Sequence, residues 1–308
     1  MTKPLKRDIS GILLLDKPIG ISSNAALQQV KRLYQARKAG HTGSLDNLAS
    51  GLLPICLGEA TKVSGYLLDS DKRYRTTCTL GETTTTADAE GEITRSRAWA
   101  HLDVATIQAA LPGFLGAQSQ VPPMYSALKR QGQPLYKLAR RGEVVEREPR
   151  DIQIYALTLL GLTDNRLELE VHCSKGTYIR TLVEDLGEVL GCGAHVSVLR
   201  RLGVKHFQNM IDFATLHQLA EQGLTALDAQ LLPIETALPD WPAVYLPADL
   251  VHWVQQGQAV QVPHAPAQGQ VKIMTEDLRF LGIGEVLDDG RVAPRRLVHS
   301  AGTETHTA

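Results

Sequence analysis

Residues 40–54 are the stretch that most constrains how this chain can fold. They read Gly-His-Thr-Gly-Ser-Leu-Asp-Asn-Leu-Ala-Ser-Gly-Leu-Leu-Pro, with three glycines and one proline in fifteen residues. Glycine permits a backbone with positive φ and lets another part of the chain approach closely. Asp46 is the one ionisable side chain between Gly43 and Gly51. The pattern predicts a tight loop that presents a single carboxylate, which suits either a catalytic acid or an ordinary Asx turn.

Length and composition bound the class of protein. The chain has 308 residues, 43% of them hydrophobic and 21% charged, which favours a globular protein of two domains, or of one domain with an appendage. The net charge of -1 gives no support to a generally basic nucleic-acid binder, so any RNA contact must come from local patches.

None of the four cysteines has the spacing of a redox or zinc motif, so we expect buried thiols in a reducing compartment. No apolar run could span a bilayer and no signal peptide is evident, so we expect a cytoplasmic protein without membrane contact.

Hydrophobic periodicity and turn residues predict the order of elements. Strands are expected over residues 11–16, 72–80 and 166–173. Helices are expected from Ser22 or Ser23, over 61–68, from Asp103, from Thr177, and over 212–222. Prolines at 233, 239 and 242 then mark a connector. Short β segments are expected after it, over residues 258–262, 271–274, 280–286 and 291–292, with a hairpin turn at 288–290.

Residues 124–150 are more basic than the rest of the chain. They hold seven lysines and arginines against three glutamates, a local charge of +4 in a chain of net charge -1. A polar turn at 131–134 precedes a short amphipathic segment at 135–138. The composition suits either a solvated face or a mobile insertion that grips a phosphate backbone.

The stretch around Asp46 resembles the signature of the TruB family of tRNA pseudouridine synthases, Gly-His-Thr-Gly-small-Leu-Asp-Pro-Leu-Ala-small-Gly. The match continues through residues 57–62. One residue differs from the signature: Asn47 stands where the family usually has proline. The loop therefore lacks the restraint that proline would place on the backbone of Asp46.

Further motifs of the same family follow in family order. Lys-Gly-Thr-Tyr-Ile-Arg at 175–180 and Gly-Cys-Gly-Ala-His-Val-Ser-Val-Leu-Arg-Arg at 191–201 resemble its second and third motifs. Met-Tyr-Ser-Ala-Leu-Lys at 124–129 matches the start of its RNA-gripping insertion. The β-rich segments after Val244 resemble a PUA domain, a small RNA-binding appendage whose arginines at 291, 295 and 296 could contact phosphate.

The resemblance implies roles for seven residues, and the polar loop or hairpin expected near the site at 83–91 adds Asp88. Asp46 would be the catalytic carboxylate and Arg180 its paired cation. Tyr74 would stack on the target base, which offsets part of the cost of unstacking it. The other expected site residues bind or surround the nucleotide or support the site: His41, Tyr178, Leu199, Lys17 and Asp88. Taken alone, a histidine such as His41 or a strand-ending lysine such as Lys17 is more often structural.

The resemblance also implies a fold and an activity. The expected fold is α+β, a pseudouridine synthase fold whose mixed, mainly antiparallel sheet is flanked by helices. It divides the chain into a catalytic domain (1–242) with the insertion (124–150), a PUA domain (243–300) and a disordered tail (301–308). The implied activity is isomerisation of uridine to pseudouridine at position 55 in the T-loop of tRNA, with the base flipped out. We therefore expect the T-arm stem-loop as partner and a monomeric enzyme.

We expect no metal and no cofactor. The isomerisation needs no redox or energy input, and the sequence holds no Walker loop, no Rossmann glycine pattern and no metal-ligand cluster.

Two other functions stay open on the sequence alone. A non-catalytic tRNA-binding or tRNA-folding module would keep Tyr74 and the basic insertion, and would not need Asp46 or Arg180. A hydrolase would use Asp46 with His41, and would need a second acid, base or metal that no nearby residue clearly provides. The sequence also leaves open whether Asp46 attacks C6, attacks C1′ or removes a C2′ proton.

Overall fold

The structure, a computed structural model, describes residues 6–299 of the chain. Its helices, with η for a 3-10 turn, are α1 (Ser23–Leu33), η1 (Gly58–Lys62), α2 (Ser64–Leu68), α3 (Val104–Ala110), η2 (Leu111–Phe114), α4 (Leu135–Ala139), α5 (Ile179–Val189), α6 (Phe213–Glu221), α7 (Leu224–Asp228), η3 (Ile234–Ala237) and α8 (Ala248–Gln255). Its strands are β1 (Gly11–Lys17), β2 (Ala39–His41), β3 (Ala49–Leu57), β4 (Lys72–Leu80), β5 (Glu82–Thr84), β6 (Ile93–Ser96), β7 (Gly116–Gln120), β8 (Lys129–Arg130), β9 (Gln133–Pro134), β10 (Arg150–Thr163), β11 (Arg166–Cys173), β12 (Ala194–Val204), β13 (Ala243–Leu246), β14 (Gly269–Thr275), β15 (Phe280–Val286) and β16 (Val292–Leu297).

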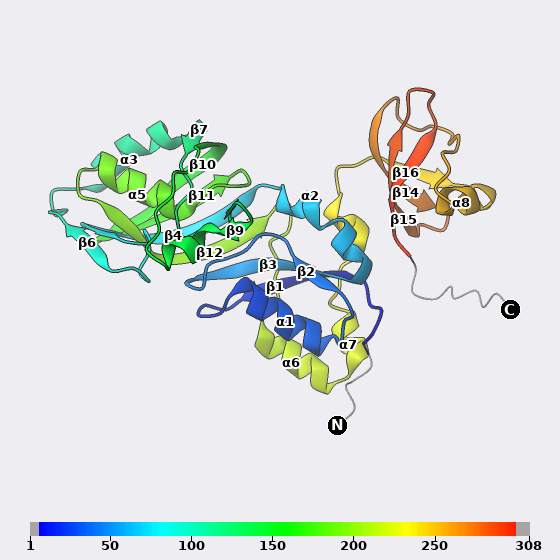
Figure 1. Cartoon of the computed structure of the whole chain (residues 1–308), viewed down its shortest axis with the longest axis horizontal. Coiled ribbons are helices and arrows are strands. Elements are labelled where there is room, and N and C mark those ends of the chain that lie inside the picture. The colour runs from blue at the N-terminus through cyan, green and yellow to red at the C-terminus, as the bar shows by residue number, and fades with distance from the viewer. Residues whose placement is uncertain (1–5, 300–308) are drawn as a thin grey trace.

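An eight-stranded sheet forms the centre of the molecule. Its strands run in the order β1-β3-β12-β4-β11-β10-β7, and β2 pairs with β3 beside this path. The pair β3–β12 is parallel and the other pairs are antiparallel. Helices α1, α3, α5 and α6 bury apolar side chains in one continuous core with the sheet. Figure 1 shows α3 and α5 over the β10–β12 end and α1 and α6 beside β1 and β3.

The C-terminal part is a second, smaller sheet, which shares an apolar cluster with the first part. Its order is β13-β14-β15-β16, with α8 beside it. A second core joins the opposite face of β1 and β3 to this sheet, through contacts that include Ile12, Leu52, Leu67, Met274 and Phe280. The two parts therefore bury apolar surface against each other, and not only across a flexible connector.

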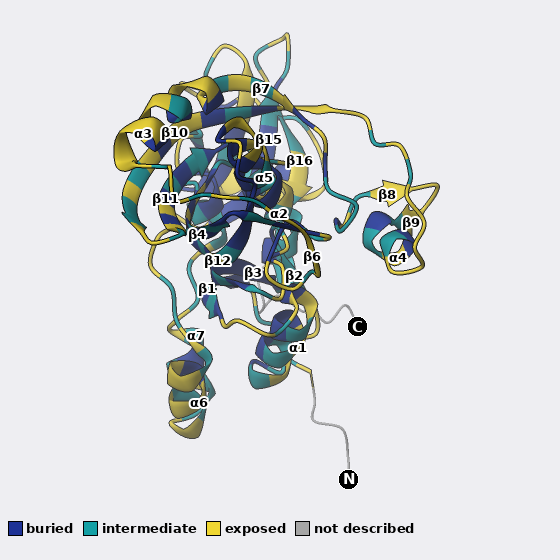
Figure 2. Cartoon of the chain, turned by 90° about the vertical axis from the view of Figure 1, so that its left-hand side faces the viewer, coloured by how far each residue is buried: buried dark blue, intermediate teal, exposed yellow. Residues whose placement is uncertain are grey.

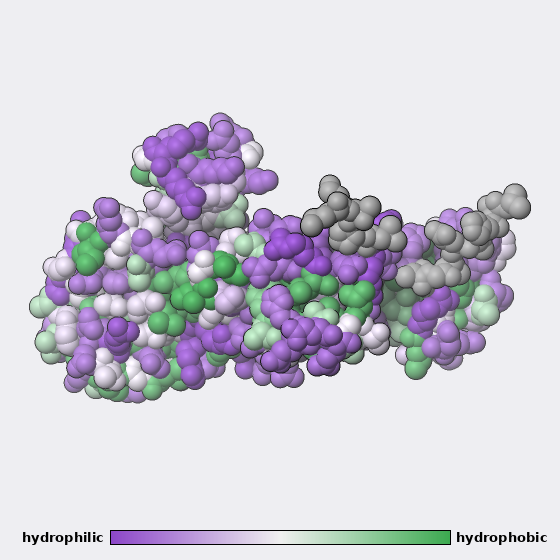
Figure 3. Space-filling model, turned by 90° about the horizontal axis from the view of Figure 1, so that it is seen from below, coloured by the Kyte–Doolittle hydropathy of each residue, from purple (hydrophilic) through white to green (hydrophobic). Residues whose placement is uncertain are grey.

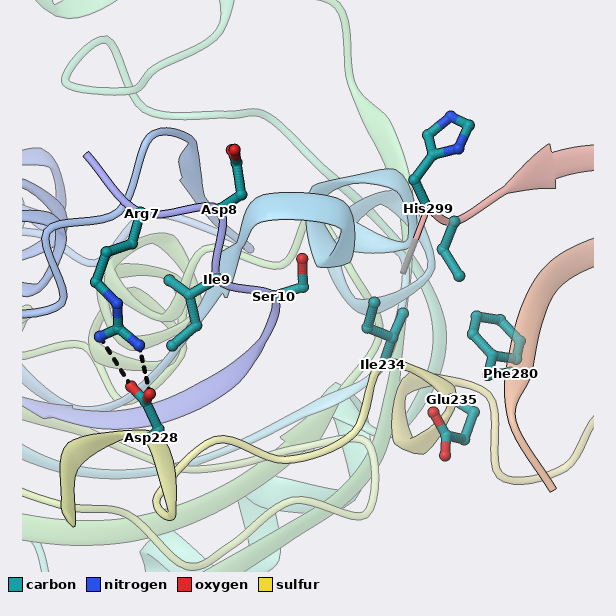
Figure 4. A pocket seen from close by; sticks show the side chains of 10 residues that line it. Arg7, Asp8, Ile9, Ser10, Asp228, Ile234, Glu235, Phe280 and His299 are labelled. Carbon is teal, nitrogen blue, oxygen red and sulfur yellow. Dashed lines mark hydrogen bonds and ion pairs between the residues drawn. The ribbon is translucent and has the colours of Figure 1, made fainter. Parts of the chain in front are cut away.

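Polar contacts reinforce this junction. Lys62 Nζ donates to the Leu297 carbonyl at 2.7 Å, and the His299 N–H donates to the Glu59 carboxylate at 2.8 Å. A pocket of about 380 Å³ lies beside His299. Figure 4 shows its lining, with Ile234 and Phe280 on one side and the Arg7–Asp228 ion pair on the other.

The basic insertion projects from the body of the molecule. Figure 2 shows β8, β9 and α4 standing away from the main sheet, and Figure 3 shows this lobe as mainly hydrophilic. Leu135 and Leu138 are buried within the lobe, so the predicted short amphipathic segment is α4. The predicted turn joins β8 to β9 through Gln131 and Gly132, both with positive φ.

Most of the predicted elements are present. The predicted strands correspond to β1, β4 and β11, and the predicted helices to α1, η1 with α2, α3, α5 and α6. The first helix is capped by Ser22, whose hydroxyl accepts a hydrogen bond from the Ala25 N–H. The predicted tail at 301–308 lies outside the described residues.

The predicted strand at 258–262 is wrong, and the sequence interpretation missed α8. Val260 forms an isolated bridge with Val292, and the segment makes no longer ladder. Val260 and Val262 are buried, so their alternation reflects packing and not strand pairing. Gly257 turns the chain with positive φ on one side, and Pro263, which lacks an N–H, ends the segment on the other.

No helix among residues 6–299 is both long enough and apolar enough to cross a membrane.

Candidate active site

A small pocket over the middle of the main sheet brings together five of the eight predicted site residues. Its volume is about 110 Å³. The predicted residues that line it are Asp46, Tyr74, Tyr178, Arg180 and Leu199, and the others are Ser44, Leu45, Thr177 and Ile179. They come from the loop before β3, from β4, from the start of α5 and from β12.

Strand register explains why these distant segments meet. Leu199 of β12 pairs with Ala49 of β3 on one side and with Thr76 of β4 on the other. The loop that precedes Ala49 therefore lies next to the strand that carries Leu199. Tyr74 lies two residues from Thr76 and shares its face of β4, because side chains alternate along a strand.

The loop that carries Asp46 is held by Ser23, the first residue of α1. The Ser23 hydroxyl donates to the Leu45 carbonyl at 3.0 Å and accepts from the Leu45 N–H at 2.7 Å. The Gly20 N–H donates to the Asn47 carbonyl at 2.8 Å. These bonds restrain the loop although Asn47 replaces the proline that the family usually has.

Arg180 joins two carboxylates. Its Nε lies 3.0 Å from Asp46 Oδ2, and its Nη1 lies 3.4 Å from Asp88 Oδ2. The same guanidinium donates to the carbonyls of Thr86 at 3.1 Å and Tyr125 at 2.7 Å. The Arg180 and Asp88 side chains are 5% and 3% exposed, whereas the Asp46 side chain is 43% exposed. The arrangement fixes Arg180 from within and leaves part of the Asp46 carboxylate open to the pocket.

Electrostatics at Asp46 show why the pairing matters. Burial raises the pKa of the Asp46 carboxyl, and the nearby Arg180 guanidinium opposes that rise. Asp88 adds to the rise in pKa, while Lys17 lowers it. A carboxylate that acts as a nucleophile or base must be ionised, so Arg180 supports the reactive form.

The two tyrosines are held differently. Tyr74 is buried, and burial raises the pKa of its hydroxyl, so it is neutral at ordinary pH. Tyr178 precedes α5, where Gln120 of β7 holds its backbone. The Gln120 side chain accepts from the Tyr178 N–H at 2.8 Å and donates to the Tyr178 carbonyl at 3.1 Å. Both rings are thereby placed at the wall of the pocket.

Lys17, His41 and Asp88 lie outside the pocket. Lys17 is fully buried, and its ammonium group donates to the carbonyls of Pro18 and Ile21, both at 2.8 Å. Burial lowers the pKa of Lys17 to about 8. His41 is half-buried on β2, and burial lowers the pKa of its ring. Asp88 supports the site through Arg180.

Sequence reasoning missed three residues that build the site: Ser23, Gln120 and Arg201. Arg201 is fully buried and donates to the carbonyls on both sides of the Asp46 loop. Its signal was present, because Leu199 and Arg201 are two apart on a strand and so share one face. Ser23 and Gln120 act through contacts that are distant in sequence.

Among residues 6–299, no three or more His, Cys, Asp or Glu side chains are grouped so that they could hold a metal ion.

Comparison with known families decides the identity. The profile described as TruB family pseudouridylate synthase, N-terminal domain, matches residues 31–179. The tRNA pseudouridylate synthase B C-terminal domain matches residues 180–239, and the C-terminal domain of pseudouridine synthase II TruB matches residues 242–298. The chain belongs to the TruB family. It is therefore a pseudouridine synthase, an isomerase, as the sequence predicted.

Curated TruB relatives match over almost their whole length. A protein of Nitrosococcus oceani named tRNA pseudouridine synthase B is 57% identical over 296 residues, which are 96% of each chain. A protein of the same name from Stutzerimonas stutzeri is 56% identical over 97% of this chain and 98% of its own.

Solved structures confirm the α+β fold expected for TruB. An H/ACA RNP bound to a substrate RNA containing 2′-deoxyuridine matches with a TM-score of 0.70 at 22% identity, over 94% of this chain and 85% of that chain. A Cbf5-Nop10-Gar1 complex matches with a TM-score of 0.69 at 25% identity, over 93% and 84% of the two chains.

Proposed function

We propose that this TruB enzyme converts uridine to pseudouridine at position 55 in the T-loop of tRNA, with Asp46 as the essential catalytic carboxylate. One observation carries the proposal: Asp46 is the carboxylate that opens onto the pocket, and it is paired with a buried, fixed Arg180. The names of the curated relatives support tRNA as the substrate. We propose that the enzyme acts as a monomer in the cytoplasm.

The pocket suits a base that has left its stack. Isomerisation breaks the N1–C1′ bond, turns the base and joins C5 to C1′; C5 releases its proton to water and N1 takes up a proton. The pocket volume of about 110 Å³ leaves no room for a base pair, so the target uridine must be flipped out to enter. Tyr74 would offer an aromatic face, worth about 1–3 kcal/mol for a stacked base. Tyr178 and Leu199 would form the other walls, with His41 beside the flipped nucleotide.

The insertion would grip the RNA backbone. A groove of about 410 Å³ lies at its base and is lined by Lys129, Arg130, Arg147 and Arg150, with Glu146 and Glu148 among them. The Arg147 Nε is buried and has no hydrogen-bond partner among the described residues. The ammonium and guanidinium groups of the lining residues suit phosphate oxygens.

The C-terminal part would add affinity and no chemistry. We propose that residues 243–300 form a PUA domain next to a catalytic domain of residues 1–242. A second groove, of about 460 Å³, lies between the two and is lined by Lys62, Arg295, Arg296 and His299. Its positive side chains would contact phosphates of the tRNA outside the T-loop.

The test uses a T-arm stem-loop with tritium on C5 of each uridine. The synthase releases the label of position 55 into water and leaves the RNA chain intact. A stem-loop with cytidine at position 55 is the control and should release no label. Release from both RNAs would contradict the proposed position. RNA binding without release would favour a non-catalytic module, and cleavage of the RNA would favour a hydrolase.

A further inference from the structure

Arg201 is one of the largest fully buried side chains of the protein, with 1% of the residue exposed. It has no Asp or Glu within ion-pair distance among residues 6–299. Burying a cation without a counter-charge is unfavourable unless its donors are well used. The hydrogen-bond partners of the Arg201 side chain therefore indicate its role.

The Arg201 side chain spans the loop that carries Asp46. Its Nε donates to the Leu52 carbonyl at 2.6 Å, and its Nη2 donates to the Gly43 carbonyl at 3.1 Å. These two carbonyls stand on either side of Asp46 in the sequence. The strands also approach closely here, because a Cβ on Gly51 would lie 2.2 Å from the Arg201 carbonyl oxygen. Arg201 thus ties both ends of the loop to β12.

The same side chain reaches Tyr74 on the neighbouring strand. Arg201 of β12 is directly paired in register with Tyr74 of β4. The guanidinium lowers the pKa of the Tyr74 hydroxyl, against the larger effect of burial. An arginine carries donors and no acceptor, so any hydrogen bond from Arg201 to the Tyr74 oxygen leaves the hydroxyl proton of Tyr74 available.

We propose that Arg201 is a positioning residue, which holds the Asp46 loop and the Tyr74 hydroxyl in one fixed relation. The proposal rests on the proposed role of Asp46. It requires the planar fork of the guanidinium, because one ammonium group has no equivalent pair of directed donors for Leu52 and Gly43. Arg201 itself is not among the residues that line the pocket.

The experiment compares Arg201→Lys and Arg201→Met in the full chain, with Arg200→Lys as matched control. Arg200 is the next residue of β12, points to the other face, and pairs with Asp16 at 2.6 Å and 3.0 Å. We expect both Arg201 variants to lower kcat about 100-fold, as for reacting groups misplaced by about 1 Å, with RNA affinity within about 3-fold of wild type. Arg200→Lys should keep kcat.

A double-mutant cycle with Tyr74→Phe separates positioning from a purely structural role. If Arg201 acts through the Tyr74 hydroxyl, Arg201→Lys should cost much less in the Tyr74→Phe background than alone. Full kcat in Arg201→Lys, or losses that simply add, would overturn the proposal even where the melting temperature falls. If Arg201→Met does not fold, the comparison uses Arg201→Lys alone, because lysine keeps a buried cation of similar length.

Failure of the proposed function would look different. A wild-type enzyme that releases no tritium from position 55 would contradict the assignment of substrate. The Arg201 variants would then be compared on bulk tRNA labelled at C5 of uridine. A loss of kcat there would support the positioning role whichever uridine is modified, and unchanged kcat would overturn it.

Discussion

Arg180 Nε lies 3.0 Å from Asp46 Oδ2, yet the arginine side chain is 5% exposed and the aspartate side chain 43%. The buried partner is fixed by Asp88 and by two carbonyls, at Thr86 and Tyr125. The pair is therefore asymmetric. The cation is part of the scaffold, and the carboxylate is the group that opens onto the pocket.

The first prediction concerns the pH dependence of kcat/KM. Burial raises the pKa of Asp46, Asp88 raises it further and Arg180 lowers it. Because the proposed nucleophile or base must be ionised, we expect activity to be lost as pH falls through this pKa. Arg180→Met should shift that acid limb to higher pH, and Asp88→Asn should shift it to lower pH. Pre-steady-state rates against pH would measure both, and shifts in the same direction would contradict the account.

The same two variants should differ in stability. Arg180→Met leaves Asp88 buried and unpaired, which should cost about 3–5 kcal/mol in the free energy of unfolding. Asp88→Asn keeps the volume and removes a charge, so its cost should be smaller. Urea denaturation at neutral pH compares the two, and an equal cost would show that Asp88 does not depend on Arg180.

The second prediction concerns Ser23, which holds the loop through Leu45. Ser23→Ala removes both bonds and should cost about 1–3 kcal/mol, since the Leu45 backbone groups lose their partner. It should also lower kcat more than it raises KM, because the loop carries Asp46. Ser22→Ala is the control: it removes the cap of α1 for about 1 kcal/mol and should leave kcat unchanged. If Ser23→Ala and Ser22→Ala lower kcat equally, Ser23 acts only through the stability of α1 and not by holding the loop.

The third prediction concerns the insertion. Arg140→Glu with Arg141→Glu should weaken tRNA binding and lower the slope of log affinity against log salt by about 1 for each phosphate that the protein no longer binds. Lys31→Glu with Arg32→Glu, in the last turn of α1, changes the net charge equally and should not alter the slope. Filter-binding at several salt concentrations provides the slopes. Equal flattening by both pairs would mean that net charge, and not the insertion, sets the binding.

The fourth prediction concerns the C-terminal groove. Arg296→Glu should lower affinity for full-length tRNA more than for the T-arm stem-loop, with kcat unchanged. Arg291→Glu is the comparison, because Arg291 is paired with Asp289 and lies outside the groove. Titration with both RNAs gives the ratio of affinities. If Arg296→Glu does not change the ratio of the two affinities, the groove does not contact the tRNA as proposed.

The sequence predicted five of the nine residues that line the pocket, because local motifs carry those five. It predicted strands such as β4 and β11 because their alternation is strict. It did not predict Ser23, Gln120 or Arg201, because their partners are backbone groups far along the chain. The register of β12 against β3 brings Arg201 to the loop, whereas Ser23 reaches Leu45 from α1 and Gln120 reaches Tyr178 from β7.

The C-terminal part shows the same limit. Prolines after residue 232 predict a connector between separable units. The structure adds a shared core at the junction, to which Leu67 of α2 and Phe280 of β15 both belong. The periodicity of apolar residues indicates which residues are buried, but not which residues they pack against. Neither this shared core nor α8 could therefore be predicted from the pattern.

Asp46→Asn tests the central claim most directly. The substitution keeps the shape of the side chain and removes the charge that a nucleophile or base needs. With the tritiated T-arm stem-loop in excess, wild type should release label over many turnovers. Asp46→Asn should release none while binding the RNA within about 3-fold of wild type, since Asp46 makes no phosphate contact. Multiple turnover by a pure Asp46→Asn protein would contradict the account.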